Sequence, residues 1–429
     1  MVCQHFFTYN SFEIFEDYRR KDNCWKGLLY KIKILVFTIM KVLYDHQTFT
    51  LQKYGGISRY YFELINRFKK DKNLECELAC KYSENAYINS SDLFKDIETG
   101  ESTEDFLYGV KFKGKAKIHR TLTRVGLASN PIILNKKNSV EIIKHNDFDI
   151  FHPTYYDPYF LKYIGNKPFV LTVHDMIHEL YAGKFFKKND KTIMAKKELA
   201  ERAYRIIAIS DSTKSDLIKL YKMDEGKIDI VYHGSSLKNE NMINTDQSLP
   251  ERYILFVGDR DLYKNFDFFL RSISKLLIED EKLKLICAGG KPFNKIESNL
   301  IKNLKLSGKI FHRSIENDNY LSGLYNKALC FIFPSLYEGF GIPILEAFSC
   351  NCPVVISNTS SLPEVGGDAA HYFDPTDSAS IYDAVKKVVY DYEFADKLRE
   401  KGSEQLKKFS WEKCACETKR VYERLLEKI

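Results

Sequence analysis

The segment 333–346 reads FPSLYEGFGIPILE and combines acidic residues, glycines and a proline. Glycines followed by a proline are typical of a turn that leads into a helix, so we expect a helix over Pro343–Ser349. Such a helix start presents free backbone N–H groups and a positive dipole end, which suit phosphate or sugar oxygens. Glu338 lies in the expected turn, and Glu346 lies about one turn into the helix. The two carboxylates can therefore face one ligand from two sides.

A basic pair follows the expected strand Tyr253–Val257, in the sequence VGDRDLYKN. Arg260 and Lys264 lie there, in the loop that leads to the next helix. Ligands of doubly wound sheets bind outside the carboxyl ends of the strands, so both side chains can reach the cleft that the acidic segment faces. Two basic loop residues are in general solvated surface, and only this position favours a binding role.

The first half of the chain has two similar features. Gly55 and Gly56 open a helix after the first expected strand, in YGGISR, where glycine lets the backbone approach a ligand closely. The expected strand Phe169–Val173 ends at His174, whose imidazole then projects into the cleft. A single histidine is more often structural, but this one stands at the carboxyl end of a buried parallel strand.

These residues must be positioned by two successive sets of strands and helices. Short β-branched and aromatic runs alternate with amphipathic stretches from Met40, and the pattern restarts at Tyr253, after the polar segment Ser235–Pro250. Such alternation predicts an α/β fold with two doubly wound, Rossmann-like domains and a cleft between them. We expect domains over 40–240 and 250–405, with a C-terminal helix over 406–429 that packs back on the first domain. The predicted strands are Val42–Asp45, Leu74–Ala79, Ile150–His152, Phe169–Val173, Arg205–Ile209, Tyr253–Val257, Leu283–Ala288, Cys330–Phe333 and Pro353–Ile356; the predicted helices are Ile57–Phe68, Asp190–Ala203, Thr213–Tyr221, Phe266–Ile278, Tyr320–Ala328, Pro343–Ser349 and Ser410–Ile429.

Residues 1–39 fit neither domain. Their apolar run, GLLYKIKILVFTIM at 27–40, is interrupted by two lysines and is shorter than the roughly 20 apolar residues of a membrane-spanning helix. It also lacks the small-residue cleavage site of a signal peptide. We expect residues 1–39 to be an extension outside the fold, and a short interfacial anchor is the alternative.

Composition excludes several classes of protein. The chain has 65 Lys+Arg and 58 Asp+Glu, a net charge of +7 that spreads along the sequence, which is too little for a nucleic-acid binder. Its 10 cysteines include no CxxC pair, so we expect reduced thiols and a cytoplasmic protein. No GxGxxG follows either opening strand, which excludes a dinucleotide oxidoreductase.

Taken in order, these motifs resemble glycosyltransferase family 4, the large family of retaining GT-B enzymes. The likeness runs from about Met40 to the C-terminus, and the acid-glycine-acid motif is its most specific part. The matched segments are YGGISR, LTVHD, IAISDSTKSDL, IVYHG, VGDRDLYKN, EGFGIPILE and FSWEK.

The resemblance implies roles for the residues above. Arg260 and Lys264 match the pair that holds the donor diphosphate, and Glu346 matches the acid that binds the nucleotide ribose. The arginine stands two residues after Gly258, where many members have it one residue after, so Lys264 is the better match. Near the transferred sugar and the phosphates, the resemblance implies His174, Glu338, the backbone of Phe340, Gly341 and Ile342, and the glycines Gly55 and Gly56.

The implied reaction is the transfer of a hexose-type sugar from a nucleotide diphosphate sugar, with retention of configuration. The implied acceptor is a saccharide or lipid-linked saccharide of lipopolysaccharide, capsule or exopolysaccharide. No cofactor and no metal are expected, because the triplets Asp147-Phe148-Asp149 and Asp259-Arg260-Asp261 are poorly placed for a metal. Base contacts are expected from the loop around 312–316. A noncatalytic carbohydrate-binding or scaffold protein on the same fold is the alternative.

Two basic clusters of the first domain predict a further partner. Both interleave cations with apolar side chains, a composition that suits peripheral contact with an anionic membrane on its inner face, although a solvated loop explains it as well. The clusters are Lys111, Lys113, Lys115, Lys117, Arg120 and Arg124, with Phe112, Ile118 and Leu122, and then Lys184, Phe185, Phe186, Lys187 and Lys188.

Overall fold

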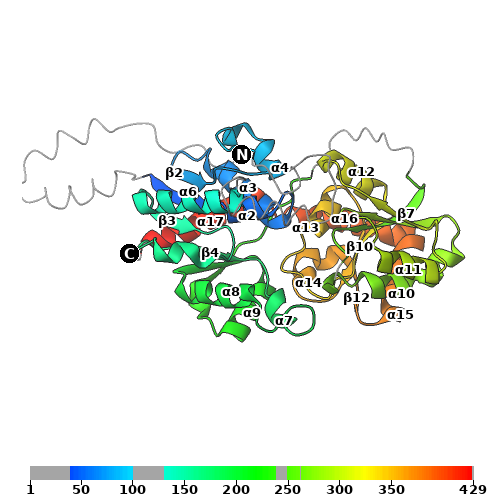
Figure 1. The fold of residues 1–429 in the computed structure, drawn as a ribbon. Coiled ribbons are helices and arrows are strands. Elements are labelled where there is room, and N and C mark those ends of the chain that lie inside the picture. The colour runs from blue at the N-terminus through cyan, green and yellow to red at the C-terminus, as the bar shows by residue number, and fades with distance from the viewer. Residues whose placement is uncertain (1–38, 100–129, 238–248, 261, 428–429) are drawn as a thin grey trace, which may run out of the picture.

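The computed structural model describes residues 39–99, 130–237, 249–260 and 262–427. In these ranges every strand pair is parallel, and the strands form two groups on either side of residues 238–248. The protein is therefore an α/β protein with two Rossmann-like domains, as the sequence predicts (Figure 1). The segment 1–38 and the first basic cluster, at 111–124, lie outside the described residues.

The first domain contains two three-stranded sheets of order β2-β1-β3 and β4-β5-β6. A parallel bridge between Phe151 and Phe169 connects them. The strands are β1 (Met40–Asp45), β2 (Leu74–Ala79), β3 (Ile150–His152), β4 (Val170–Val173), β5 (Arg205–Ala208) and β6 (Ile228–Ile230); the helices are α2 (Gln47–Leu51), α3 (Gly56–Phe68), α4 (Ala86–Asn89), α6 (Pro131–His145), α7 (Ile177–Leu180), α8 (Lys191–Arg202) and α9 (Asp211–Tyr221).

The second domain has one six-stranded sheet of order β12-β11-β10-β7-β8-β9. The chain order reverses between β7 and β10, and in such sheets the crevice at the reversal is where ligands bind. The loops after β7 and β10 carry the sequences VGDRDLYKN and SLYEGFG, so the fold brings these two motifs together. The strands are β7 (Arg252–Val257), β8 (Leu283–Ala288), β9 (Ile310–Arg313), β10 (Cys330–Phe333), β11 (Val354–Ser357) and β12 (Ala370–Phe373); the helices are α10 (Phe266–Glu279), α11 (Lys295–Asn303), α12 (Asp318–Lys327), α13 (Ile342–Ser349), α14 (Leu362–Gly366), α15 (Ser378–Tyr390) and α16 (Tyr392–Leu406).

Each predicted strand and helix is confirmed within a few residues of its ends. The prediction that His312 lies in a loop is wrong, because β9 includes it. This strand is at the sheet edge and only Ile310 of its four residues is fully buried, so it lacks the apolar run of a central strand. The sequence pattern does not predict strands β6, β9 and β12 or helices α2, α4, α6, α7, α11, α14, α15 and α16.

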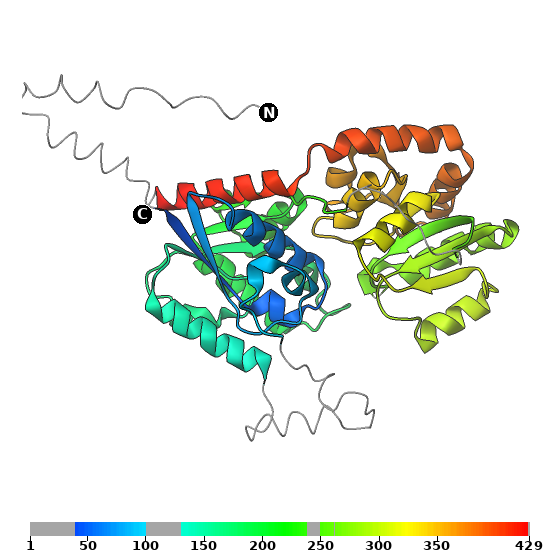
Figure 2. The same ribbon diagram turned by 90° about the horizontal axis from the view of Figure 1, so that it is seen from above.

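The C-terminal helix α17 (Trp411–Leu426) returns to the first domain. It begins at Ser410, whose hydroxyl accepts a hydrogen bond from Lys413 N at 3.1 Å, as an N-cap residue does. Figure 2 shows α17 lying along the first domain, whereas α16 covers the second. Its buried face joins the core of α3 and the first sheet through Trp411, Cys414, Ala415, Val421, Tyr422 and Leu425.

The chain crosses between the domains twice, after β6 and before α17, and the two crossing segments lie side by side. A Cβ added to Gly234, which follows β6, would stand 2.3 Å from the backbone N of Trp411. Only glycine allows this approach, so the IVYHG segment and the start of α17 form one joint between the domains.

Candidate active site

A cleft of about 660 Å³ lies between the two domains. The first domain contributes the turn before α3 and the end of β4, and the second contributes the loops after β7, β8, β9 and β10. All but one of the ten residues that the sequence predicts for the site line this cleft: Gly55, Gly56, His174, Lys264, Glu338, Phe340, Gly341, Ile342 and Glu346.

Lys264 and Glu338 form an ion pair at the centre of the second-domain wall. The Nζ of Lys264 donates to Glu338 Oε1 at 2.7 Å, and both side chains are mostly buried. Ser360 and Ser361 hold the acidic loop in place, because Glu338 N donates to Ser360 Oγ and Ser361 Oγ donates to Glu338 O, each at 2.9 Å. The Lys264 ammonium is thus paired with the Glu338 carboxylate inside the cleft. An anionic ligand in the cleft could replace Glu338 as the partner of this ammonium.

The starts of two helices meet in the same cleft. Gly341 is the N-cap of α13 and has φ +109°, a conformation that favours glycine. A Cβ added to Gly56, the first residue of α3, would lie 3.6 Å from Ile342 Cδ1, the first residue of α13. Because both helices direct their positive dipole ends here, the junction suits an anion such as a diphosphate.

His174 lies against the acidic loop. A Cβ added to Gly339 would stand 1.8 Å from His174 O, so only glycine permits this packing. The imidazole is buried among Tyr60 and Tyr61, with ring centroids 5.4 and 5.8 Å away, and burial lowers the pKa of His174 to about 4. Its Nε2 has no hydrogen-bond partner in the part of the chain that the structure describes. A neutral ring with one free nitrogen can bind a sugar hydroxyl.

Glu346 lies one turn into α13 and also lines the cleft. Burial raises the pKa of Glu346 to about 7, although the Tyr325 hydroxyl donates to its Oε2 at 3.0 Å. Sugar hydroxyls that donate to this carboxylate would favour its ionised form.

Arg260 is the predicted residue that does not reach the cleft. Its Nε donates to Glu297 Oε1 at 2.6 Å, its guanidinium lies 4.8 Å from the Phe293 ring centre, and its side chain is 4% exposed. The residue directly after Gly258 is Asp259, which lies against Gly290 of the cleft wall. The arginine comes one residue later and turns toward α11, so the expectation that it faces the cleft is corrected.

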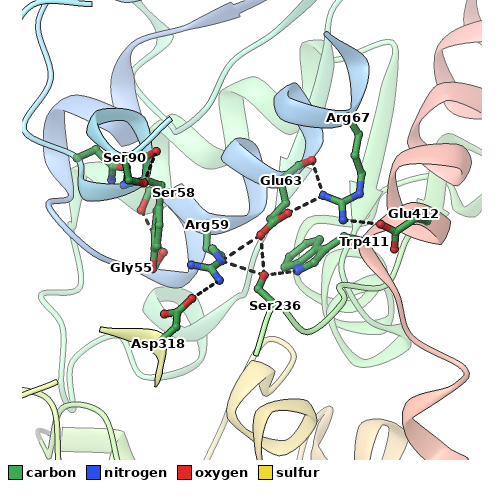
Figure 3. Close-up of polar contacts among 12 residues, drawn as sticks. Gly55, Ser58, Arg59, Glu63, Arg67, Ser90, Ser236, Asp318, Trp411 and Glu412 are labelled. Carbon is green, nitrogen blue, oxygen red and sulfur yellow. Dashed lines mark hydrogen bonds and ion pairs between the residues drawn. The ribbon is translucent and has the colours of Figure 1, made fainter. Parts of the chain in front are cut away.

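Arg59 lines the cleft instead, although sequence reasoning gave it no role. It is the fourth residue of α3, and its Nη2 donates to Asp318 Oδ2 at 2.7 Å across the gap between the domains (Figure 3). In the sequence, only its position one turn after Gly55 and Gly56 indicates a binding role for Arg59. An arginine on an amphipathic helix is in general solvated, so this position alone does not predict that Arg59 lines the cleft.

The first Asp-x-Asp triplet, Asp147 to Asp149, does not line the cleft. Asp147 and Asp149 bind Lys41, whose Nζ and backbone N each donate at 2.8 Å, at the amino end of β3. Asp261 is outside the described residues. In the described ranges, no three His, Cys, Asp or Glu side chains are grouped so that they could hold a metal ion.

None of the described helices is both long enough and apolar enough to cross a membrane.

Two family models match successive parts of the chain. The model for Glycosyltransferase Family 4 matches residues 54–238, and the model for Glycosyl transferases group 1 matches residues 238–405. The two matched ranges meet at residue 238, where the chain leaves the first domain for the second.

The chain is also similar to named mannosyltransferases. It is 27% identical over 391 residues to the O-antigen chain mannosyltransferase B of Escherichia coli, covering 86% of this chain and 96% of that protein. It is 29% identical over 218 residues to the O-antigen chain mannosyltransferase RfbU of Salmonella typhimurium, covering 51% and 60% of the two chains.

Solved structures share the fold at lower identity. Anabaena HepE, in complex with UDP and glucose, matches with a TM-score of 0.66 at 14% identity, covering 90% of this chain and 99% of that one. WaaG, a glycosyltransferase involved in lipopolysaccharide biosynthesis, matches with a TM-score of 0.61 at 13% identity, covering 86% and 95%. With a parallel two-domain fold, the acid-glycine-acid loop in the cleft and two family models over residues 54–405, the chain belongs to the GT-B glycosyltransferases of family 4.

Proposed function

We propose that the protein is a retaining, metal-independent glycosyltransferase that transfers a hexose-type sugar from a nucleotide diphosphate sugar. The proposed acceptor is a saccharide or lipid-linked saccharide in the biosynthesis of a surface polysaccharide. The observation that carries the proposal is that the starts of α3 and α13 meet at one cleft, which the Lys264–Glu338 pair also lines. The names of the O-antigen mannosyltransferases support the polysaccharide context and make mannose the first sugar to test.

The proposed chemistry follows from where charge develops. The departing diphosphate gains negative charge as the glycosidic bond breaks, and a group that stabilises this charge in the transition state accelerates the reaction. Lys264 Nζ and the backbone N–H groups at the start of α13 supply positive charge there without a metal ion. Glu338 and the neutral His174 imidazole bind the hydroxyls of the transferred sugar.

Retention requires that the acceptor oxygen attack the face of the sugar from which the diphosphate leaves. We propose a front-face reaction, in which the acceptor proton passes to the departing phosphate oxygen. The anomeric configuration of the transfer product, read by NMR, tests retention, and an inverted product would contradict it.

The function is tested with the purified full chain and a panel of nucleotide sugars. Binding is measured by thermal shift, and turnover by release of the nucleoside diphosphate, in the presence of a saccharide acceptor or of water alone. Turnover should persist in excess EDTA. If chelation abolishes turnover and a divalent ion restores it, the metal-independent reaction is wrong.

A noncatalytic carbohydrate-binding or scaffold protein is the second candidate. The pairing of Lys264 with Glu338 in the cleft favours the enzyme over the binding protein. A protein that only bound sugar would not need a cation to stabilise a departing diphosphate. Donor hydrolysis by the wild-type protein, lost in Glu338→Gln, separates the two candidates.

We further propose that the protein acts in the cytoplasm, in peripheral contact with the inner face of the membrane. In the second basic cluster, Lys184 Nζ lies 5.0 Å from the Phe185 ring centre, and the Phe185 ring stacks on neighbouring Tyr181 at 5.0 Å. Exposed lysines beside half-buried aromatic rings suit an anionic surface that also accepts apolar side chains.

A further inference from the structure

The charges of the cleft are unbalanced for an anionic ligand. Of the described residues that line it, five are acidic: Asp175, Glu316, Asp318, Glu338 and Glu346. Two are cationic, Lys264 in the second domain and Arg59 in the first. Since Arg260 is turned onto Glu297, Arg59 is the cation of this lining that can bind an anion together with Lys264.

Arg59 is close to the junction of the two helix starts. Its backbone N donates to Gly55 O at 3.0 Å, which places it one turn into α3. The same turn brings Gly56 against Ile342 at the start of α13. A long side chain that begins one turn from this junction has the reach to bind an anion held there.

The guanidinium of Arg59 is anchored along one edge. Its Nε donates to Ser236 Oγ at 2.9 Å and lies 3.2 Å from Glu63 Oε1, and its plane lies 4.7 Å from the Tyr87 ring centre. Figure 3 shows Glu63 and Ser236 beside Arg59, with the Trp411 ring nitrogen donating to Ser236. The anchored edge fixes the direction of the guanidinium.

The other edge points across the cleft to a single acid. Nη2 donates to Asp318 Oδ2 at 2.7 Å, and the Asp318 side chain is 54% exposed while that of Arg59 is 16% exposed. A solvated carboxylate is easily exchanged, because surface ion pairs contribute little free energy. A guanidinium fixed at one edge and paired with an exchangeable acid at the other is preorganised for a phosphate.

We propose that Arg59 binds the donor diphosphate from the first domain, opposite Lys264, and exchanges Asp318 for it. The diphosphate is then held by one cation from each domain. This inference rests on the proposed function, since it names a further residue for the same donor site.

A merely structural role predicts a different result, and the chain offers a matched control. Arg67 is on the same helix and shares Glu63 with Arg59, and its Nη2 donates to Glu412 Oε1 at 2.6 Å, but it does not line the cleft. If Arg59 acts only by holding this network of ion pairs, Arg67→Gln should reproduce the effect of Arg59→Gln.

The experiment measures dissociation constants of UDP, UMP, GDP and GMP by calorimetry. The variants of the full chain are Arg59→Gln, Arg59→Lys, Arg67→Gln and Lys264→Ala, each with its melting temperature. The readout is the affinity ratio of diphosphate to monophosphate, which a general loss of stability does not change selectively. We expect Arg59→Gln to lower this ratio about tenfold, as Lys264→Ala does, Arg59→Lys to lower it less, and Arg67→Gln to leave it unchanged.

Two outcomes would overturn the role of Arg59 and leave the proposed function standing. In the first, Arg59→Gln keeps the wild-type affinity ratio of diphosphate to monophosphate while Lys264→Ala lowers it. In the second, Arg67→Gln lowers the ratio as much as Arg59→Gln does. A wild-type protein that binds neither diphosphate more tightly than its monophosphate would contradict the proposed function, and the inference with it.

Discussion

Arg260 Nε and Glu297 Oε1 lie 2.6 Å apart in an ion pair that ties the loop after β7 to the start of α11. The second oxygen of Glu297 accepts a hydrogen bond from Asn294 N at 2.7 Å, which completes the capping box of α11. Arg260 therefore stabilises the wall of the cleft from behind and does not line the cleft itself.

We expect Arg260→Ala to lower the free energy of unfolding strongly and to change the affinity for nucleotides little. The two side chains are 4% and 9% exposed, and removal of one partner of a buried pair costs about 3–5 kcal/mol because the other charge stays buried. Denaturant unfolding measures the loss, and Glu297→Gln should show a similar one. A stable Arg260→Ala variant that discriminates poorly between UDP and UMP would return Arg260 to the donor site.

Lys264→Ala and Glu338→Ala should each lose transfer and stay folded. The two groups form one pair in the cleft and belong to no core cluster, so their loss removes preorganised charge and leaves the packing of the sheet intact. The expected loss is about 10²–10³ in kcat. Near-wild-type turnover in either variant, with normal circular dichroism in both, would show that this pair is not part of the active centre.

The stability of the protein should depend on pH through Glu346. Burial raises the pKa of Glu346 to about 7 in the folded state, so the folded protein binds this proton more tightly than the unfolded chain. The stability that results is fully present below the ordinary carboxyl pKa and is lost as pH rises through about 7. The melting temperature of the wild type, relative to Glu346→Gln, should therefore fall between pH 4.5 and 7.5.

Glu404→Gln is the matched control for this titration, because its carboxylate is 72% exposed on α16. Its melting temperature should follow that of the wild type over the whole range. If Glu346→Gln also does so, burial does not raise the pKa of Glu346 in the folded protein.

The membrane contact predicts cosedimentation with anionic liposomes and none with neutral ones. Each basic residue near such a surface contributes about 1 kcal/mol, which falls with salt. Substitution of Lys184, Lys187 and Lys188 by glutamine should weaken binding, and so should neutralising Lys113, Lys115 and Lys117.

The control for net charge is the same substitution at Lys275, Lys282 and Lys302, exposed lysines of the second domain. An equal loss in this control would mean that only net charge matters. Recovery in the supernatant with both liposome types at low salt would exclude the contact.

Local patterns in the sequence sufficed to predict much of the lining of the cleft. The glycines that begin α3 and α13 and the acids of EGFGIPILE were predicted at their observed places, because a turn and a helix start depend on a few neighbouring residues. The strand ending at His174 was predicted for the same reason: a buried parallel strand is a continuous apolar run.

The tertiary structure decided which cations face the cleft. In the sequence, Arg260 and Arg59 each follow a glycine turn by two or three residues. In the structure, Arg260 pairs with the buried Glu297 outside the cleft, whereas Arg59 pairs with the exposed Asp318 across the cleft. Those partners, Glu297 and Asp318, are 37 and 259 residues away in the chain. A side chain takes the direction in which its charge is best paired and solvated, and that depends on residues that only the folded chain brings together.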